Sequence, residues 1–539
     1  MVEKKIGYLE AVSIGIGGMI GGGIFAVLGL TVLLAKGAAP IAFLIAGLIA
    51  LVTAYSYAKL SVRFPSEGGT IEFIVRAFGT GVIPAWLNTL LLGSYIIMLS
   101  LYSYAFGSYG AVLILGVENI LVKKLLTAAV IILFTVLNLM GAYIVGKAED
   151  YMVAFKVFIL LFFSVLGFMT IDPSRLSPSH YPHFLHVFAG GLIIFLAYEG
   201  FELIANTAAD VKDPDKTLPK AFYTAVIFVI LIYMLVALVA VGNLDYQEVV
   251  KAQDYVLAEA AKPFLGDAGF ILISIAALVS TASAINATLY GTARISYMVA
   301  KFGELPQVFA KRIWKGAYEG LIILAALTVI AALSFNLENI SVAGSLGFLM
   351  VFGAVNLANF KLAEHTKSSR FISGLGFVAC LVAVVVLFGH NLKTSPDSLK
   401  SSVIVILATL VFEVIYRFVT KRKLSEFIDW RLREKEEFLD NFEKYLGPIL
   451  HAIRTHLKGA EVYILDDLAR GERKGANKLH LGVTVSRKLS KDEMEQQEQK
   501  IKEAAGLKEH HPLKISFVTT DEKDKLLEHS PRRLADEQK

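Results

Sequence analysis

The sequence predicts an all-α membrane protein with twelve transmembrane helices, followed by a small cytoplasmic α+β domain. Three observations predict it. The chain of 539 residues is 55% hydrophobic and 18% charged, whereas a typical soluble domain has about 45–50% apolar and about 25% charged residues. Apolar runs of about 18–25 residues, each able to cross roughly 30 Å of hydrocarbon as a helix, recur through residues 1–420. Residues 421–539 instead hold 25 basic and 23 acidic residues among 119 positions.

Charged or Pro/Gly-rich loops separate the apolar runs. The expected spans are 8–35, 39–63, 80–108, 121–140, 147–170, 184–209, 219–242, 266–299, 319–334, 339–360, 371–389 and 401–420. With the N-terminus inside, the cytoplasmic loops hold sixteen Lys and Arg residues and the opposite loops seven. The positive-inside rule therefore places both termini of this multi-pass protein in the cytoplasm. The first run extends well past signal-peptide length, so we expect it to stay in the cell membrane as a span.

The first span is rich in glycine. Six of the nine residues from Gly15 to Gly23 are glycine, and a helix interior loses about 1 kcal/mol for each glycine relative to alanine. We therefore expect this span to unwind near the bilayer midplane. Close helix packing, which Gly-x-x-x-Gly spacing permits, is the structural alternative.

The sixth span carries two carboxylates, Glu199 and Glu202, inside an apolar segment. An ionisable group at that depth is costly and marks a functional site by default. If spans 1–5 and 6–10 form two halves, an interrupted span opens each half, which is the sequence signature of the substrate site in an inverted-repeat transporter. The alternative is that each carboxyl is buried, hydrogen-bonded and purely structural.

Composition excludes several other functions. The net charge of +5 is spread along loops, so no nucleic acid partner is expected. The lone cysteine, Cys380, permits neither a disulfide bond nor a thiolate metal cluster. We expect no metal, no cofactor and no catalytic residues.

Four motifs, in this order along the chain, resemble the amino acid–polyamine–organocation transporter superfamily over about residues 5–420. The first two are Gly-Gly-Met-Ile-Gly-Gly-Gly-Ile-Phe at 17–25 and Ala-Tyr-Glu-Gly-Phe-Glu at 197–202, the latter followed by charged and proline-containing segments at 210–214 and 217–219. The third begins with Ser-Thr-Ala-Ser at 280–283 and ends with Gly-Glu-Leu-Pro at 303–306, and the fourth is Val-Asn-Leu-Ala-Asn at 355–359. The resemblance implies a five-plus-five inverted-repeat fold with two further spans, broken spans 1 and 6, and alternating access around a midplane site.

The candidate substrate-binding residues lie in the two interrupted spans. Amides at the start of a half-helix suit a substrate carboxylate, and carbonyls freed by unwinding can accept hydrogen bonds from an ammonium group. The amides are those of Gly21, Gly22 and Gly23, and the carbonyls are those of Gly17, Gly18, Met19, Leu196, Ala197 and Tyr198. We expect Glu199 to bias the site toward amines and Glu202 to handle protons or gate the pathway, with only one of the two facing the substrate.

Lys156 lies inside the fifth span, where a lone amine needs a partner or must lose its proton. The resemblance implies that this amine occupies the place where sodium-coupled relatives bind their ion. Ser280, Thr281 and Ser283 are expected to line the same space. Lys156 and Glu202 are therefore the candidate proton-coupling residues, and the alternative for Lys156 is a structural bond to backbone carbonyls.

Residues 421–446 read as a charged connector helix, and residues 447–539 as an α+β unit with strands near 461–465, 479–485 and 513–518. This unit resembles a minimal nucleotidyltransferase domain through Ala-Arg-Gly-Glu at 469–472. Asp466 and Asp467 replace the expected Gly-Ser, and Lys478 and His480 replace an Asp-x-Asp pair. Lysine and histidine cannot hold Mg²⁺, so we expect an inactive, regulatory domain that binds a nucleotide or a cytoplasmic protein.

The function expected from these observations is secondary active transport of amino acids or related amines, coupled to protons as symport. The expected partners are a small-molecule substrate, protons and the lipid bilayer, and no enzyme activity is expected. The alternatives are transport of an inorganic cation such as potassium and a solute-sensing membrane receptor. A membrane-anchored enzyme is disfavoured because the tail lacks the carboxylate pair.

Overall fold

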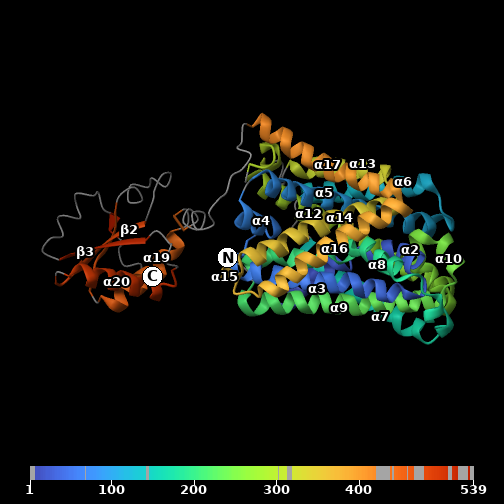
Figure 1. Ribbon diagram of the computed structural model, residues 1–539, viewed down its shortest axis with the longest axis horizontal. Coiled ribbons are helices and arrows are strands. Elements are labelled where there is room, and N and C mark those ends of the chain that lie inside the picture. Colours follow the sequence, from blue (N-terminus) through green and yellow to red (C-terminus); the bar gives the residue numbers. More distant parts are fainter. Residues whose placement is uncertain are drawn as a thin grey trace. The chain divides into compact units, whose positions relative to one another are not determined.

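The computed structural model describes residues 6–66, 68–79, 81–140, 145–301, 303–311, 319–420, 438–439, 442–457, 459–465, 479–487, 489–507, 513–519 and 532–533. The chain divides into two compact units, Met1–Phe427 and Ile428–Lys539. Each is described by itself (Figure 1).

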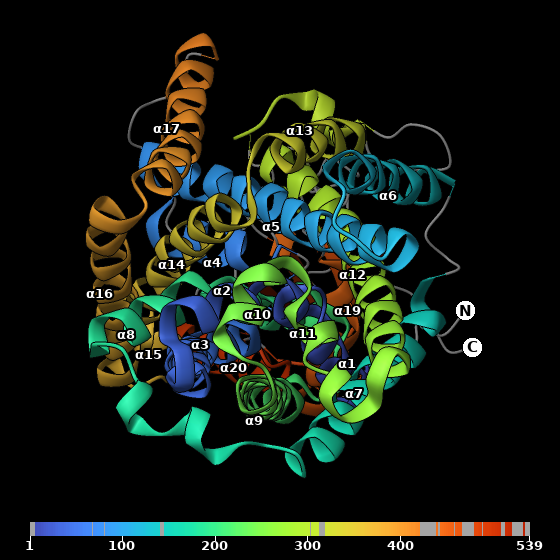
Figure 2. The ribbon, with the colours of Figure 1, turned by 90° about the vertical axis from the view of Figure 1, so that its right-hand side faces the viewer.

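The first unit is a bundle of long helices that run roughly side by side (Figure 1, Figure 2). Its longer helices are α1 Tyr8–Met19, α2 Gly23–Ala35, α3 Ala39–Arg63, α4 Thr70–Phe78, α5 Val82–Leu115, α6 Ile120–Met140, α7 Val145–Phe168, α8 Phe184–Ile193, η5 Phe195–Asp210, α9 Pro214–Asn243, α12 Lys262–Lys301, α13 Gly320–Ser334, α14 Leu337–Lys361, α16 Arg370–Thr394 and α17 Pro396–Val419. The short connecting helices are η1 Lys36–Ala38, η3 Pro173–Leu176, η4 Pro178–His180, α10 Tyr246–Lys251, η6 Gln253–Tyr255, α11 Val256–Glu259, η7 Gln307–Ala310 and α15 Ala363–Thr366.

A helix lies in each of the twelve ranges that the sequence singles out as spans. Within the described residues, nine helical stretches are long and apolar enough to cross a membrane, with Gly23–Arg63 counted as one stretch, and the bent pair α8 and η5 makes a tenth. The apolar helix α13 has only 15 residues. The structure therefore supports a multi-pass membrane protein, and the count of twelve stays a prediction.

Burial separates central helices from peripheral ones. The most apolar 18-residue window of α14 is 89% buried, whereas the corresponding windows of α16 and α17 are 28% and 17% buried. Figure 2 shows α16 and α17 at the edge of the bundle. Most of the exposed side chains of α16 and α17 are apolar, as expected of helices whose solvent is lipid.

The first predicted break is present. Helix α1 ends at Met19, α2 begins at Gly23, and Ile20–Gly22 form a turn between them. The sixth span is interrupted in a different way. Helix α8 ends at Ile193, and the following sixteen residues form η5, a 3₁₀ helix whose axis is bent by 41° from that of α8. Runs of 3₁₀ helix beyond about four residues are uncommon and often mark a hinge.

A β-bridge joins the two interrupted spans at one end of the bundle. The amide of Ile6 donates to the Asp210 carbonyl at 2.8 Å, and the amide of Lys212 donates to the Ile6 carbonyl at 2.9 Å. Because Ile6 precedes α1 and Asp210 ends η5, the two interrupted spans are tied together by their backbones at this end.

The second unit contains α19 Glu443–His456, β1 Val462–Leu465, β2 Leu479–Val485, α20 Lys491–Ala504, β3 Leu513–Thr519 and β4 Arg532–Arg533. Its sheet has the order β3-β2-β1-β4, in which β1 pairs antiparallel with β2 and β4, and β2 pairs parallel with β3. One face of the sheet packs against α19 and α20 through side chains such as Ile453, Leu481 and Ile501. The unit is thus α+β, as the sequence predicts.

Only some of the predicted boundaries and motifs of the tail lie within the described residues. The contact boundary between the units falls at Phe427, and α19 begins at Glu443, inside the range expected for the connector. Asp466, Asp467 and Lys478, together with the segment 469–472, lie outside the described residues. His480 is described: it lies on β2, is 9% exposed, and its Nε2 is 2.8 Å from the Ser516 hydroxyl on β3.

Candidate functional site

The two interrupted spans touch through glycine. An ideal Cβ built on Gly18 would lie 2.8 Å from the Gly200 carbonyl oxygen, and one built on Gly200 would overlap the Gly18 carbonyl carbon. Real Cβ atoms do not approach this closely. Glycine is therefore needed at both positions for the backbones of α1 and η5 to meet, so the glycine run serves close packing as well as unwinding.

Side chains from four other helices satisfy the carbonyls that the first break frees. Lys156 of α7 donates to the Gly17 carbonyl at 2.8 Å, and Tyr102 of α5 donates to the Gly18 carbonyl at 3.4 Å. The Tyr233 hydroxyl of α9 donates to Met19 at 2.5 Å and to Ala197 of η5 at 3.2 Å. The fourth donor is Ser280 of α12, which bonds the Ile20 carbonyl at 2.9 Å and also the Gly21 carbonyl.

These bonds follow from the cost of leaving backbone groups unpaired in an apolar interior, which is several kcal/mol for each group. The sequence analysis expects some of these carbonyls to receive a substrate ammonium. In this structure the carbonyls of Gly17, Gly18, Met19 and Ala197 each receive a side-chain donor from the protein instead.

The amide side of the break is tightly packed. An added Cβ would lie 2.7 Å from the Ala284 methyl at Gly21, 2.5 Å from the Tyr102 ring at Gly22, and 2.8 Å from the Ala197 methyl at Gly23. All three glycines are buried. The close approach of these neighbours explains why this segment requires glycine.

The three hydroxyls expected beside Lys156 differ in what they do. Lys156 is fully buried, and Ser280 bonds the same break that Lys156 reaches. Thr281 turns its hydroxyl back to the Ala277 carbonyl of its own helix at 2.7 Å, and its methyl lies toward Gly22. Ser283 is buried. Lys156 and Ser280 are thus brought to one place, and Thr281 contributes an apolar contact.

Glu202 accepts three hydroxyl donors from three different helices. Tyr57 of α3 and Thr70 of α4 each lie 2.9 Å from Oε2, and Tyr95 of α5 donates to Oε1. Glu202 is 1% exposed. The Glu202 carboxyl therefore links η5 to α3, α4 and α5 through these three hydrogen bonds.

Glu199 differs from Glu202 in its partners. It is 3% exposed, and among the described residues its Oε1 has no hydrogen-bond partner. It lies within electrostatic range of the Tyr102 hydroxyl. A buried carboxyl oxygen without a partner is unfavourable unless a proton, a cation or a ligand donor reaches it.

Glu199 and Glu202 lie three residues apart on η5, and the expectation that only one of them faces the substrate stays a prediction. Residues three apart in a 3₁₀ helix lie one above the other, and Glu199 and Glu202 are both within η5. The backbone therefore places both residues on the same side of η5.

The other residues predicted in the sixth span make structural bonds. The Leu196 amide donates to the Ser345 hydroxyl of α14 at 3.1 Å, and Ser345 donates to the Ile193 carbonyl at 2.7 Å. The Tyr198 hydroxyl donates to the Phe43 carbonyl of α3 at 2.9 Å. Ser345 thereby bridges the junction between α8 and η5.

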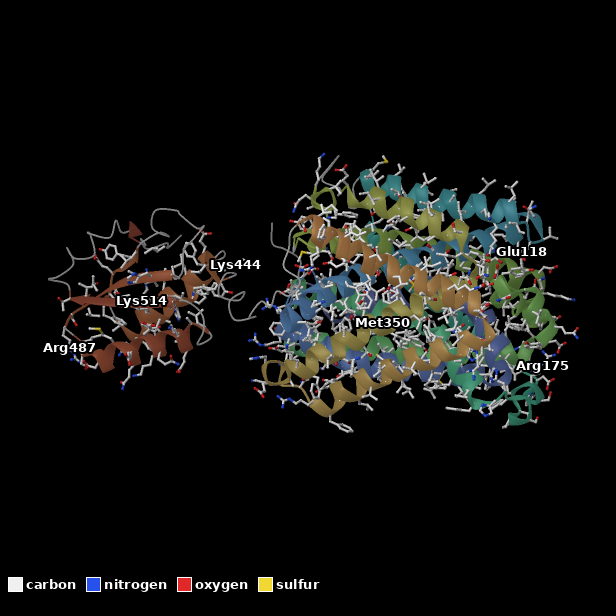
Figure 3. The ribbon with its side chains drawn as sticks, turned by 45° about the horizontal axis from the view of Figure 1, so that its top comes forward. Glu118, Arg175, Met350, Lys444, Arg487 and Lys514 are labelled. Carbon is white, nitrogen blue, oxygen red and sulfur yellow. The ribbon has the colours of Figure 1, made fainter. Side chains whose placement is uncertain are left out.

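A second polar cluster lies at the opposite end of the bundle from the Ile6 bridge. Lys123 of α6 pairs with Asp254 of η6 and lies 3.4 Å from Glu118. The Tyr104 and Ser108 hydroxyls of α5 donate to Asp254 at 3.1 and 3.4 Å. Nearby, Arg175 pairs with Asp245 at 2.9 Å, and Figure 3 shows Glu118 and Arg175 at this same end. These ion pairs and hydrogen bonds hold the segment from α10 to α11 against the helices of the bundle.

Sequence reasoning missed most of the side chains that complete the site. Four of these side chains are tyrosines that lie in apolar runs: Tyr57, Tyr95, Tyr102 and Tyr233. Because the aromatic ring fits the apolar pattern, the sequence gives no sign that the hydroxyl has a polar role. Lys123, near the start of α6, is one basic residue beside a loop, and its position in the sequence gives no sign of its partner Asp254. Among the described residues no group of three or more His, Cys, Asp or Glu side chains is placed to hold a metal ion.

Comparison with known proteins places these features in a family. A family model described as amino acid permease matches residues 6–412. An uncharacterized protein of Methanocaldococcus jannaschii is 38% identical over 78% of this chain and 98% of its own length. The inner membrane transport protein YbaT of Escherichia coli is 33% identical over 78% of this chain and 97% of its own length. A cationic amino acid transporter of Arabidopsis thaliana, the chloroplastic transporter 9, is 29% identical over 57% of each chain.

The fold also resembles a solved structure. A mutant manganese transporter of Eremococcus coleocola superimposes with a TM-score of 0.52 over 77% of this chain and 96% of that chain, at 13% identity. At this identity the likeness concerns the fold alone. The family match ends at residue 412, before the second unit begins.

Proposed function

The chain belongs to the amino acid permease family, and from that premise we propose that it is a secondary active transporter of amino acids or related amines, coupled to protons. The observation that carries the proposal is the contact between two interrupted spans at Gly18 and Gly200. Interrupted spans supply helix ends and backbone polar groups at the depth where a transporter binds its substrate.

In this proposal the substrate carboxylate binds near the amides of Gly21 to Gly23, at the positive end of α2. The substrate ammonium bonds to carbonyls of the first break. Glu199 supports this assignment, because its partnerless oxygen suits an amine or a cationic side chain. The small side chains around the break, Ala197, Thr281 and Ala284, favour a compact substrate.

Proton coupling is assigned to Lys156, with Glu202 as a second proton-handling or gating group. Lys156 bonds a carbonyl of the first break from α7, so a change in its protonation alters the bonding of that break. Glu202 links the sixth span to α3, α4 and α5 through three hydroxyls, so its protonation changes which of those hydroxyls can donate to it. The proposal includes alternating access, a five-plus-five inverted repeat, twelve spans and cytoplasmic termini.

The tail is proposed to regulate transport from the cytoplasm. The basis is chemical: the expected Asp-x-Asp pair is replaced by lysine and histidine, which do not hold Mg²⁺. Regulation requires that the tail interact differently with two states of the transporter. Deletion of residues 421–539 is expected to leave a folded protein with an altered transport rate, and measured nucleotidyl transfer would contradict this assignment.

The proposed function is tested with the purified full chain. A thermal-shift screen across amino acids, polyamines and inorganic cations identifies ligands, because a ligand that binds the native state raises its stability. Flux into proteoliposomes is then measured under a proton gradient and under a sodium gradient. Uptake of an amino acid or amine that follows the proton gradient supports the proposal. Flux of potassium alone favours the cation alternative, and binding without flux favours the receptor.

A further inference from the structure

Tyr102 spans the whole first break. Its ring lies over the amide side, where an added Cβ would be 2.5 Å from Cδ1 at Gly22 and 3.3 Å from Cζ at Gly21. Its hydroxyl reaches the carbonyl side and donates to Gly18 at 3.4 Å. The side chain is 1% exposed. One tyrosine therefore packs beside two of the three glycines whose amides are assigned to a substrate carboxylate, and bonds a carbonyl assigned to its ammonium.

Tyr102 is the bulky member of the group that packs on these glycines. The other atoms close to Cβ positions at Gly21, Gly22 and Gly23 belong to Ala284, Thr281, Ala197 and the Gly18 carbonyl. Alanine has no side-chain torsion to turn, and the Thr281 hydroxyl is anchored to its own helix. With the backbone fixed, rotation of Tyr102 is the change that opens room over the break.

The hydrogen bond that holds Tyr102 is the longest at the break. The bonds to the two neighbouring carbonyls, from Lys156 to Gly17 and from Tyr233 to Met19, are 2.8 and 2.5 Å long, against 3.4 Å for Tyr102 to Gly18. Hydrogen bonds weaken as the distance grows toward 3.5 Å. A charged ammonium forms a shorter and stronger bond to a carbonyl than a neutral hydroxyl does. The Gly18 carbonyl is therefore the one that exchanges its partner most readily.

We propose that the Tyr102 side chain occupies, in this structure, the place of the substrate's amino and carboxyl groups, and that the substrate displaces it on binding. We call it a displaceable plug, and the extent of its displacement sets the size of the substrate that fits. This inference rests on the proposed function and identifies a specificity-determining residue for it. The substrate competes with Tyr102 for the Gly18 carbonyl and for the space over Gly22. A smaller residue at position 102 then admits larger substrates.

The test measures ligand binding by thermal shift and calorimetry on the full chain and on three variants, with glycine, alanine, leucine, phenylalanine and lysine as the probes. Tyr102→Phe keeps the ring and removes the competing bond, so it is expected to bind the ligand of the unmodified chain about two- to five-fold more tightly. Tyr102→Ala is expected to gain binding of leucine or phenylalanine. Tyr109→Phe is the matched control, because Tyr109 lies two turns along α5, is fully buried and donates to the Phe25 carbonyl of α2 at 3.1 Å.

Each outcome decides the proposal. Tighter binding in Tyr102→Phe, with affinity unchanged in Tyr109→Phe, supports the plug, as does a wider range of ligands in Tyr102→Ala. Loss of all binding in Tyr102→Phe overturns it, because the hydroxyl would then bind the substrate itself. An unchanged affinity in Tyr102→Phe together with an unchanged range in Tyr102→Ala also overturns it. If neither the unmodified chain nor any variant responds to any probe, the proposed function fails, and the plug fails with it.

Discussion

Gly18 and Gly200 lie in backbone contact, with no room for a methyl group on either residue. One belongs to α1 and the other to η5, so the two interrupted spans touch directly through their backbones. A contact between backbones cannot adapt by changing a side-chain rotamer. The relative position of α1 and η5 is thus fixed at this point in the structure.

The first prediction concerns that contact. Gly200→Ala is expected to lower the free energy of unfolding by about 3 kcal/mol, because overpacking against backbone has no soft neighbour to move. The measurement is the thermal unfolding midpoint in detergent, together with flux. The control is Gly389→Ala in α16, where an added Cβ meets nothing within 4 Å and the helix gains up to about 1 kcal/mol. Equal midpoints in the two variants would contradict the prediction.

The second prediction separates the two carboxylates. Glu202→Gln places an amide NH₂ among three hydroxyl donors, so it is expected to lower stability by about 1–3 kcal/mol. Glu199→Gln disturbs no hydrogen bond in the described residues, so it is expected to keep stability and to change substrate selectivity. Unfolding midpoints and a substrate panel check both. Identical stability and selectivity in the two variants would show that their roles are wrongly divided.

The third prediction concerns ion coupling. Lys156→Ala removes the buried amine that bonds the Gly17 carbonyl, and proton-driven flux at neutral pH is expected to fall at least about tenfold, or about 1.4 kcal/mol. Flux by the unmodified chain should be the same in sodium and in potassium buffers. The control is Lys400→Ala, at an exposed position where Lys400 pairs with Asp397, three residues earlier on the same helix. A sodium requirement in the unmodified chain would refute proton coupling.

The fourth prediction concerns the cluster around Asp254. The Lys123 and Asp254 side chains are 9% and 14% exposed, so breaking the pair leaves a poorly solvated charge. Lys123→Ala and Asp254→Asn are each expected to lower stability by about 2 kcal/mol, with coupling above about 1 kcal/mol in a double-mutant cycle. The exposed pair Lys400 and Asp397 serves as the reference cycle, for which coupling below about 0.5 kcal/mol is expected. Coupling at Lys123 and Asp254 no larger than in the reference would contradict the prediction.

The fifth prediction concerns the second unit. The Ser490 amide donates to Glu493 at 2.8 Å and Arg487 pairs with it at 2.7 Å, and these contacts hold the pKa of the Glu493 carboxyl below its usual value. A carboxyl with a lowered folded pKa stabilises the fold above its unfolded pKa of about 4.3, and this contribution is lost as the pH falls through the folded pKa.

The change that tests this is Glu493→Gln, which does not titrate. Calorimetry of the full chain should show the variant less stable than the unmodified chain at pH 7, and the difference should shrink toward pH 3. The matched control is Glu495→Gln, because Glu495 is an exposed glutamate two residues farther along α20. A difference between Glu493→Gln and the unmodified chain that stays constant with pH would contradict the assignment.

The sequence predicts the helical elements and both interruptions because their causes are local. Six glycines within nine residues weaken a helix wherever it lies, and two carboxylates in an apolar run are costly at the centre of a membrane. Strand and helix positions in the second unit follow from the same kind of local pattern. Most helix ends in the structure accordingly lie within five residues of the expected ranges, whereas α5 runs seven residues past its expected end, to Leu115.

The partners within the site could not be predicted, since they depend on packing between residues far apart in the chain. Tyr233 is 36 residues from Ala197, which it bonds, and Tyr95 is 107 residues from Glu202. The sequence predicts that the carbonyls of the first break are open to a ligand, whereas side chains of four helices bond to them. It also treated Gly22 as a space for an anion, and the ring of Tyr102 lies there.

The 3₁₀ form of η5 has a geometric consequence for the end of the sixth span. A 3₁₀ helix rises about 2.0 Å per residue and an α-helix about 1.5 Å, so the sixteen residues of η5 are about 8 Å longer than the same residues would be in α-helical form. A change of helix type would draw Asp210 toward Ile193 by that distance. Since Asp210 bonds Ile6, Ile6 would be pulled along with it, and a local change in η5 would become a displacement of the segment that leads into α1.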